Sequence, residues 1–103
     1  MEIRRLFPEP DLPCGGERFE TLLETQGLRI ERILSAPGSA SGPYDQDMDE
    51  WVLLLQGEAL LEIEGERVNL KAGEALSIPA HARHRVLDTS ADPSCIWLAV
   101  HFR

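Results

Sequence analysis

The feature that most constrains the fold is a glycine–glutamate dipeptide that recurs at eight-residue intervals, at residues 57–58, 65–66 and 73–74. Glycine adopts the positive φ that a tight turn demands, so evenly spaced glycines between short apolar runs are typical of successive β-hairpins. The runs between them, 59–63 and 67–71, alternate apolar and polar residues. Such alternation places one face of a strand in a core and the other in water. The pattern therefore predicts an antiparallel sheet.

Two further segments are apolar on both faces, WVLLLQ at 51–56 and CIWLAVHF at 95–102. A strand of this kind is covered twice, by a second sheet or by another subunit. The segment 17–35 is predicted to form two strands around a turn at 26–27, with a short helix over 16–26 as the alternative for its first half. About eight short strands with little or no helix indicate an all-β fold, a sandwich or a barrel.

The composition indicates one globular domain. With 103 residues, 43 % of them hydrophobic, the chain has room for a single core, which we divide into an N-terminal arm (1–16) and a barrel (17–103). No apolar run approaches the ~20 residues that cross a bilayer, and the N-terminus lacks the pattern of a secretory signal. We therefore expect a cytoplasmic protein in which Cys14 and Cys95 are reduced.

The charge of the chain bears on its partners. A net charge of −8 disfavours nucleic acid and anionic membrane surfaces, because both reward clustered Lys and Arg. The densest basic patch is RHR at 83–85, which is too short for a nucleic-acid footprint. We expect neither partner.

Two segments resemble the paired motifs of the cupin superfamily. The first motif reads Gly, five residues, His-x-His, three or four residues, Glu, six residues and Gly; Glu50 and Gly57 match its end at the right spacing. The second reads Gly, five residues, Pro-x-Gly, two residues, His, three residues and Asn; Gly73, Pro79 and His84 match. The resemblance implies a small single-domain cupin, a jelly-roll β-barrel with a pocket at its mouth and a metal held by residues from both motifs.

The first motif departs from the family pattern where it usually holds two histidines. With three intervening residues these positions are Tyr44 and Gln46, and with four they are Pro43 and Asp45. Only the glutamate of the first motif and the histidine of the second therefore carry over directly. In the second motif His81 replaces the glycine, and we expect it at the surface or pocket rim rather than on a metal.

Glu50 has a physical reason to be a ligand. It shares a strand face with Val52 and Leu54, which are apolar and predicted to point inward. An ionised carboxylate on an inward face is costly unless it is paired or bound to a metal. The alternative is a salt bridge to Arg83 or Arg85 at the rim.

The remaining ligands are drawn from the second motif and from the loop before Glu50. For His84 the alternative to a ligand is a hydrogen-bonded core histidine. Gln46 offers a side-chain carbonyl, and Tyr44 or Asp45 offers an oxygen; for each of them the alternative is a solvated loop residue. Such donors suit divalent metals such as Zn, Fe, Mn or Ni without choosing among them. We therefore predict a divalent metal ion held by Glu50, His84, Gln46 and Tyr44.

His101 is a further candidate ligand. It follows Trp97 and Ala99 on one face of the last predicted strand. Should that face line the cavity, His101 would join His84 and Glu50 in a two-histidine, one-carboxylate set of the kind that oxygen-activating iron sites use. The alternative is a histidine packed beside Trp97.

Two functions are open at this point. In the first, the barrel binds a divalent metal and acts on a small polar molecule, with the metal as a Lewis acid or oxygen-binding centre. In the second, a metal-free barrel binds a ligand or works as a dimeric interaction module. The retained Glu50 and His84 favour the first function, whereas the missing histidines of the first motif favour the second.

We expect a homodimer under either function. Trp51, Leu53 and Leu55 lie on the strand face opposite Glu50, and a barrel of 103 residues has little else to cover them. Burying side chains of this size is worth roughly 1.5–3 kcal/mol each.

Overall fold

The computed structural model describes residues 1–7 and 12–103. Within these residues the chain forms strands and no helix, as predicted, and so holds no helix that could cross a membrane. The segment 17–25 is a strand, so the helical alternative for it is wrong. The strands are β1 (Glu17–Thr25), β2 (Leu28–Ser35), β3 (Asp49–Gln56), β4 (Glu58–Ile63), β5 (Glu66–Lys71), β6 (Ala75–Ile78), β7 (His84–Thr89) and β8 (Ile96–Phe102).

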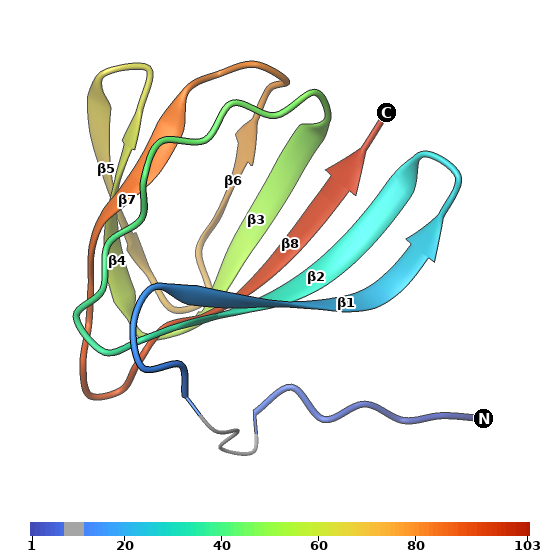
Figure 1. Ribbon diagram of the computed structural model, residues 1–103, viewed down its shortest axis with the longest axis horizontal. Coiled ribbons are helices and arrows are strands. Elements are labelled where there is room, and N and C mark those ends of the chain that lie inside the picture. Colours follow the sequence, from blue (N-terminus) through green and yellow to red (C-terminus); the bar gives the residue numbers. More distant parts are fainter. Residues whose placement is uncertain (8–11) are drawn as a thin grey trace.

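The strands form two antiparallel sheets that face each other. One sheet has five strands in the order β1-β2-β8-β3-β6, and the other has three in the order β5-β4-β7. Figure 1 shows them as two layers, with β5, β4 and β7 on one side and β3, β8 and β2 on the other. The all-β jelly-roll arrangement that the sequence predicted is confirmed.

The recurring glycines lie in the turns between strands, but only Gly65 forms the predicted hairpin, since β4 pairs with β5. Gly57 and Gly73 join strands of different sheets, so the expectation of successive hairpins is wrong at these two turns. Gly57 carries the chain from β3 to β4, and so from one sheet to the other, at a φ of 93°. A Cβ at this position would lie 2.8 Å from both Cys95 Sγ and Ser90 Oγ. Gly65, in the turn between β4 and β5, has a φ of 82° but no atom close to where a Cβ would stand. Gly57 is therefore required both by its backbone conformation and by its neighbours.

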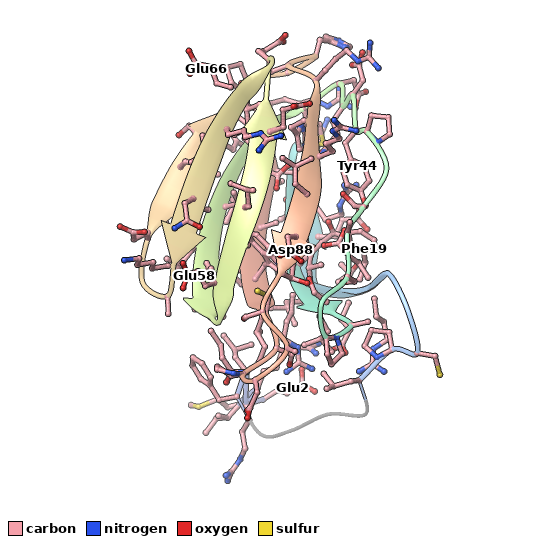
Figure 2. All side chains as sticks on the ribbon, turned by 90° about the vertical axis from the view of Figure 1, so that its left-hand side faces the viewer. Glu2, Phe19, Tyr44, Glu58, Glu66 and Asp88 are labelled. Atoms are coloured by element: carbon pink, nitrogen blue, oxygen red, sulfur yellow. The ribbon has the colours of Figure 1, made fainter. Side chains whose placement is uncertain are left out.

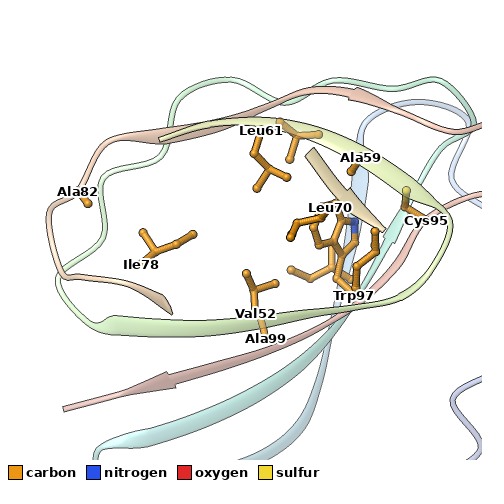
Figure 3. Packing of buried hydrophobic residues seen from close by; sticks show 12 residues of the cluster. Val52, Ala59, Leu61, Leu70, Ile78, Ala82, Cys95, Trp97 and Ala99 are labelled. Carbon is orange, nitrogen blue, oxygen red and sulfur yellow. The ribbon is translucent and has the colours of Figure 1, made fainter. Parts of the chain in front are cut away.

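The hydrophobic core fills one end of the space between the sheets more densely than the other. Ala59, Leu70 and Trp97 crowd together at one end, whereas Ile78 and Ala82 lie apart at the other (Figure 3). All five side chains are buried. The looser end is where a cavity opens.

The connection between β2 and β3, residues 36–48, runs alongside β7 (Figure 1). Tyr44 and His84 exchange two backbone hydrogen bonds, of 2.6 and 3.1 Å. The backbone N–H of Ser41 donates to the carbonyl of Val86 at 2.9 Å, and that of His81 donates to the carbonyl of Gln46 at 2.7 Å. These bonds hold residues 44–46 against the start of β7, next to the second motif.

Candidate functional site

A cavity of about 490 Å³ lies between the two sheets. Its apolar wall comes from both sheets and includes Phe19, Ile33, Val52, Leu61, Val86 and Trp97. Its polar wall is built mainly from the five-stranded sheet and the 36–48 connection. The cavity thus combines an apolar wall with a concentrated set of polar and charged groups, an arrangement suited to a small polar molecule.

Three of the predicted ligands converge in this cavity. Gln46 comes from the loop, Glu50 from the start of β3 and His84 from the start of β7. Gln46 Nε2 lies 3.0 Å from Glu50 Oε1 and 3.3 Å from His84 Nε2, and His84 Nε2 lies 3.7 Å from Glu50 Oε1. Glu50 is only 7 % exposed and His84 only 8 %. The structure therefore brings together side chains that are up to 38 positions apart in the chain.

The alternation along β3 explains how the carboxylate of Glu50 reaches the interior. Glu50, Val52 and Leu54 are all buried, whereas Trp51 between them is exposed, as predicted. The alternative considered for Glu50, a rim salt bridge to Arg83 or Arg85, is wrong, because its carboxylate accepts from the Gln46 amide among the described residues. Arg85 instead pairs with Glu62 of the neighbouring strand.

The imidazole of His84 is oriented as a metal-binding histidine is. Its Nδ1 lies 3.0 Å from the carbonyl oxygen of Ala82, which only accepts, so Nδ1 donates to it. Nε2, the nitrogen that would bind a metal in the neutral ring, faces Gln46 and Glu50. A metal-binding histidine is usually oriented by such a bond from its other nitrogen.

The residues present fit a divalent metal if Gln46 is counted among them. Within the described ranges, no three His, Cys, Asp or Glu side chains lie close enough together to hold an ion. Glu50 and His84 supply one carboxylate and one imidazole, and the Gln46 amide reaches both. In the orientation described, the NH₂ of the amide faces these two acceptors; turning the amide over would present its carbonyl oxygen instead. One nitrogen and two oxygen donors suit the divalent transition metals.

Tyr44, the fourth predicted ligand, lies beside this cluster with its hydroxyl directed elsewhere. The hydroxyl donates to Glu17 Oε1 at 2.9 Å, and the ring centre lies 5.6 Å from that of His84. Burial, and then the neighbouring charge of Glu17, raise the pKa of Tyr44 to about 12, so its hydroxyl keeps its proton. Burial also raises the pKa of the Glu17 carboxyl, against the opposing effect of the Tyr44 hydrogen bond.

The rim of the cavity carries the residues that the sequence placed at its surface. His81 is exposed, and its Nδ1 lies 2.9 Å from Asp45 Oδ1, so these two side chains partner each other. Asp45 is exposed as well. The prediction that His81 stands at the rim is confirmed.

A second polar group lies on the five-stranded sheet beside Glu50, since His101 is paired with Glu50 in the register. His101 shares a face with Trp97 and Ala99, as predicted; this face is buried and lines the cavity, and His101 Nε2 lies 2.9 Å from Glu31 Oε1. The two-histidine, one-carboxylate set is therefore not assembled in the described residues, because His101 pairs with Glu31 rather than joining His84 and Glu50.

The comparison with known families gives the class of the protein. The family model described as "Cupin domain" matches residues 32–101. This span is more than half of the chain, so the protein belongs to the cupin family. The match begins inside β2 and ends inside β8, and it contains both segments that resemble the cupin motifs.

Solved structures agree with this class. The fold superposes with a TM-score of 0.90 on a proposed mannose-6-phosphate isomerase of Ralstonia eutropha, at 40 % identity over 99 % of this chain and 98 % of that one. A cupin superfamily protein of Desulfitobacterium hafniense superposes with a TM-score of 0.77, at 20 % identity over 99 % of this chain and 98 % of that one. At that lower identity the likeness concerns the fold alone.

A curated relative is matched over only part of its own length. The endoribonuclease YbeY of Myxococcus xanthus is 30 % identical over 84 residues. The match covers 77 % of this chain, but the chain spans only 27 % of the length of that protein.

Proposed function

We propose that this cupin binds a small polar molecule in its cavity, next to a divalent metal held by Glu50, His84 and Gln46. The observation that carries the proposal is the convergence of these three side chains within 3.7 Å of one another, with Glu50 and His84 buried and Gln46 half-buried. When bound, the metal would supply a Lewis acid that polarises an oxygen of the ligand.

The residues around the cluster would position that ligand. Phe19 and Trp97 offer apolar surface on one side of the cavity, and Tyr44 keeps its proton and so remains a hydrogen-bond donor. The 40 % identity with the proposed mannose-6-phosphate isomerase of Ralstonia eutropha makes a sugar-like molecule a reasonable first ligand to test.

Metal content tests this proposal directly. Protein purified without a histidine tag is offered Zn, Fe, Mn and Ni in turn, and the bound metal is measured by elemental analysis. We expect one metal per chain and a rise in melting temperature with the preferred ion, because a ligand bound only by the native state stabilises it. His84→Ala and Glu50→Gln should lose the metal, whereas His81→Ala at the rim should keep it. Untagged wild-type protein that retains none of the four ions would overturn the proposal.

A metal-free binding module is the second candidate, and the orientation of the Gln46 amide favours it. Its NH₂ lies within hydrogen-bond distance of both Glu50 and His84, so the buried carboxylate is already partnered without a cation. Under this alternative Gln46→Ala leaves Glu50 buried and unpaired, and the resulting loss of stability is not recovered by adding any metal. Under the first candidate the same variant binds the metal more weakly, through Glu50 and His84 alone, and regains stability only at higher metal concentrations than wild type needs.

A further inference from the structure

We propose that Arg29, Glu31 and His101 form a second binding centre in the cavity, a subsite for the hydroxyl groups of an uncharged polyhydroxy ligand. The inference rests on the proposed function, in that the cavity takes a small polar molecule, and it names the class of that molecule. All three side chains line the cavity from the inner face of the five-stranded sheet.

The register of the sheet places this centre beside the candidate metal ligands. Arg29 of β2 pairs with His101 of β8, and His101 pairs in turn with Glu50 of β3. Neighbouring strands lie ~4.8 Å apart, so the three residues form one inward row. A ligand that contacts a metal at Glu50 can therefore reach His101 and Arg29 at the same time.

Three buried nitrogens of this centre have no hydrogen-bond partner among the described residues. His101 is 3 % exposed, and two of these nitrogens are those of its ring. The 2.9 Å contact of its Nε2 with Glu31 Oε1 falls within ion-pair range, but its geometry is not that of a hydrogen bond. Arg29 Nε is also buried without one, and lies 3.7 Å from the same Glu31 oxygen.

Such atoms need an explanation, because a buried polar group without a partner lowers the stability of the native state. The fold does not require them: the inward positions of β4 on the opposite sheet, such as Ala59 and Leu61, are apolar. A ligand in the cavity would satisfy them. The centre is therefore explained by binding rather than by folding.

The chemistry of the centre selects for hydroxyl groups. Arg29 donates, Glu31 accepts, and a neutral imidazole does one of each. A hydroxyl group both donates and accepts, so adjacent hydroxyls of a sugar match this set. A phosphate or carboxylate does not, because Glu17, Glu31 and Glu50 all line the cavity, whereas Arg29 is the only Lys or Arg among its described lining residues.

The ligand inferred here differs from the one in the name of the Ralstonia eutropha protein. That name contains a sugar phosphate, mannose 6-phosphate, whereas this subsite suits an unphosphorylated sugar. The test compares D-mannose, D-fructose and D-glucose with their 6-phosphates, with and without added Zn²⁺, by calorimetry and by NMR. The NMR experiment follows the Nε–H signal of Arg29 and the ring signals of His101. We expect at least one free hexose to bind and to shift these signals, and its 6-phosphate to bind at least tenfold more weakly.

Variants distinguish a binding role from a structural one. Glu31→Gln and His101→Phe should each weaken hexose binding at least tenfold. His101→Phe removes two unpartnered nitrogens, so the melting temperature of the ligand-free protein should stay the same or rise. Arg32→Gln, on the outward side of the same strand as Arg29, serves as the control and should bind the hexose like wild type.

Each outcome decides between the two proposals. A 6-phosphate that binds as tightly as the free hexose, or no binding of any hexose by metal-loaded protein, overturns this subsite. So does a hexose that binds equally well to Glu31→Gln and His101→Phe. If the protein holds no metal but binds hexose through His101, the proposed metal site is wrong and the subsite proposal is supported.

Discussion

The two sheets of this barrel distribute polarity differently. The three-stranded sheet is conventional: Leu61 and Val86 point inward, while Glu58, Glu62 and Asp88 point outward, where Figure 2 shows Glu58 and Asp88 at the surface. The five-stranded sheet carries charged and polar residues on its inner face near the cavity, and its outer face is largely apolar apart from the ion-pair cluster of Arg18, Glu20 and Arg32. A sheet that faces water on one side normally places its charges there. This difference is what we expect if the inner face serves binding and a second copy of the chain covers the apolar part of the outer face.

Four apolar side chains form a continuous outer row across the five-stranded sheet. Leu23 of β1 pairs with Ile30 of β2, Ile30 with Val100 of β8, and Val100 with Trp51 of β3. Leu23 is 50 % exposed and Trp51 39 %. This outer row is the surface on which we expect a second copy of the chain to pack, which would account for its composition.

The largest difference in the free energy of unfolding should be between substitutions of an inward residue on each sheet. Leu61→Ala should lower the free energy of unfolding by about 2–5 kcal/mol, because it leaves a cavity in a packed core. Glu50→Gln should change it by less than about 1 kcal/mol, because it removes a buried charge and keeps a partner for Gln46. Urea denaturation measures both. A Glu50→Gln loss as large as that of Leu61→Ala would mean that the inner faces of the two sheets do not differ in role.

The junction between the sheets should be more sensitive than a turn within one sheet. Gly57→Ala should cost about 2–4 kcal/mol, because it combines a strained positive φ with a collision against Cys95 and Ser90. Gly65→Ala, in the turn between β4 and β5, has the same conformational strain but free space around it, and should cost about 1–2 kcal/mol. Thermal unfolding of the two variants side by side tests this. Equal losses would show that the contact at Gly57 contributes nothing.

A charge introduced on the two outer faces should affect assembly differently. Wild-type protein is expected to scatter light as a particle of twice its 11.5 kDa chain mass at micromolar concentration. Trp51→Glu should shift it to monomer, since burying one such side chain is worth about 1.5–3 kcal/mol. Arg67→Glu, on the outer face of the three-stranded sheet, should leave the dimer intact. A wild-type monomer would contradict the expectation about the outer row.

The smallest effect concerns the pH dependence of one inward carboxyl. Burial raises the pKa of Glu17, so between its ordinary value of 4.5 and its folded-state value the native chain holds a proton that the unfolded chain has lost. Stability therefore falls as pH rises through this window. Glu17→Gln keeps an acceptor for Tyr44 and has no such proton to lose, so its melting temperature should gain on that of wild type as pH rises. If the difference in melting temperature between wild type and Glu17→Gln does not change with pH, the pKa of Glu17 is not raised in the folded protein.

The sequence predicted most of the fold and about half of the site, for reasons visible in single residues. The spaced glycines and the alternation along β4 and β5 depend on local backbone geometry, which neighbouring residues specify. Glu50 and His84 lie in motifs with a fixed spacing. Arg29 and Glu31 were missed because β2 alternates Leu28 and Ile30 with charged residues, a pattern that ordinarily places the charges outside. The position of Glu17 beside Tyr44 depends on contacts between distant segments, which periodicity does not reveal.

The side chains that the β2–β3 connection contributes to this site can be replaced without changing its backbone. Residues 44–46 are held in place by hydrogen bonds between main-chain atoms, and these do not depend on which side chains the residues carry. A substitution at Tyr44 or Gln46 therefore changes the donors offered to the cavity while the strands remain paired as they are. New ligand chemistry could arise in a descendant of this protein, or be introduced by engineering, through one or two codons in a single loop.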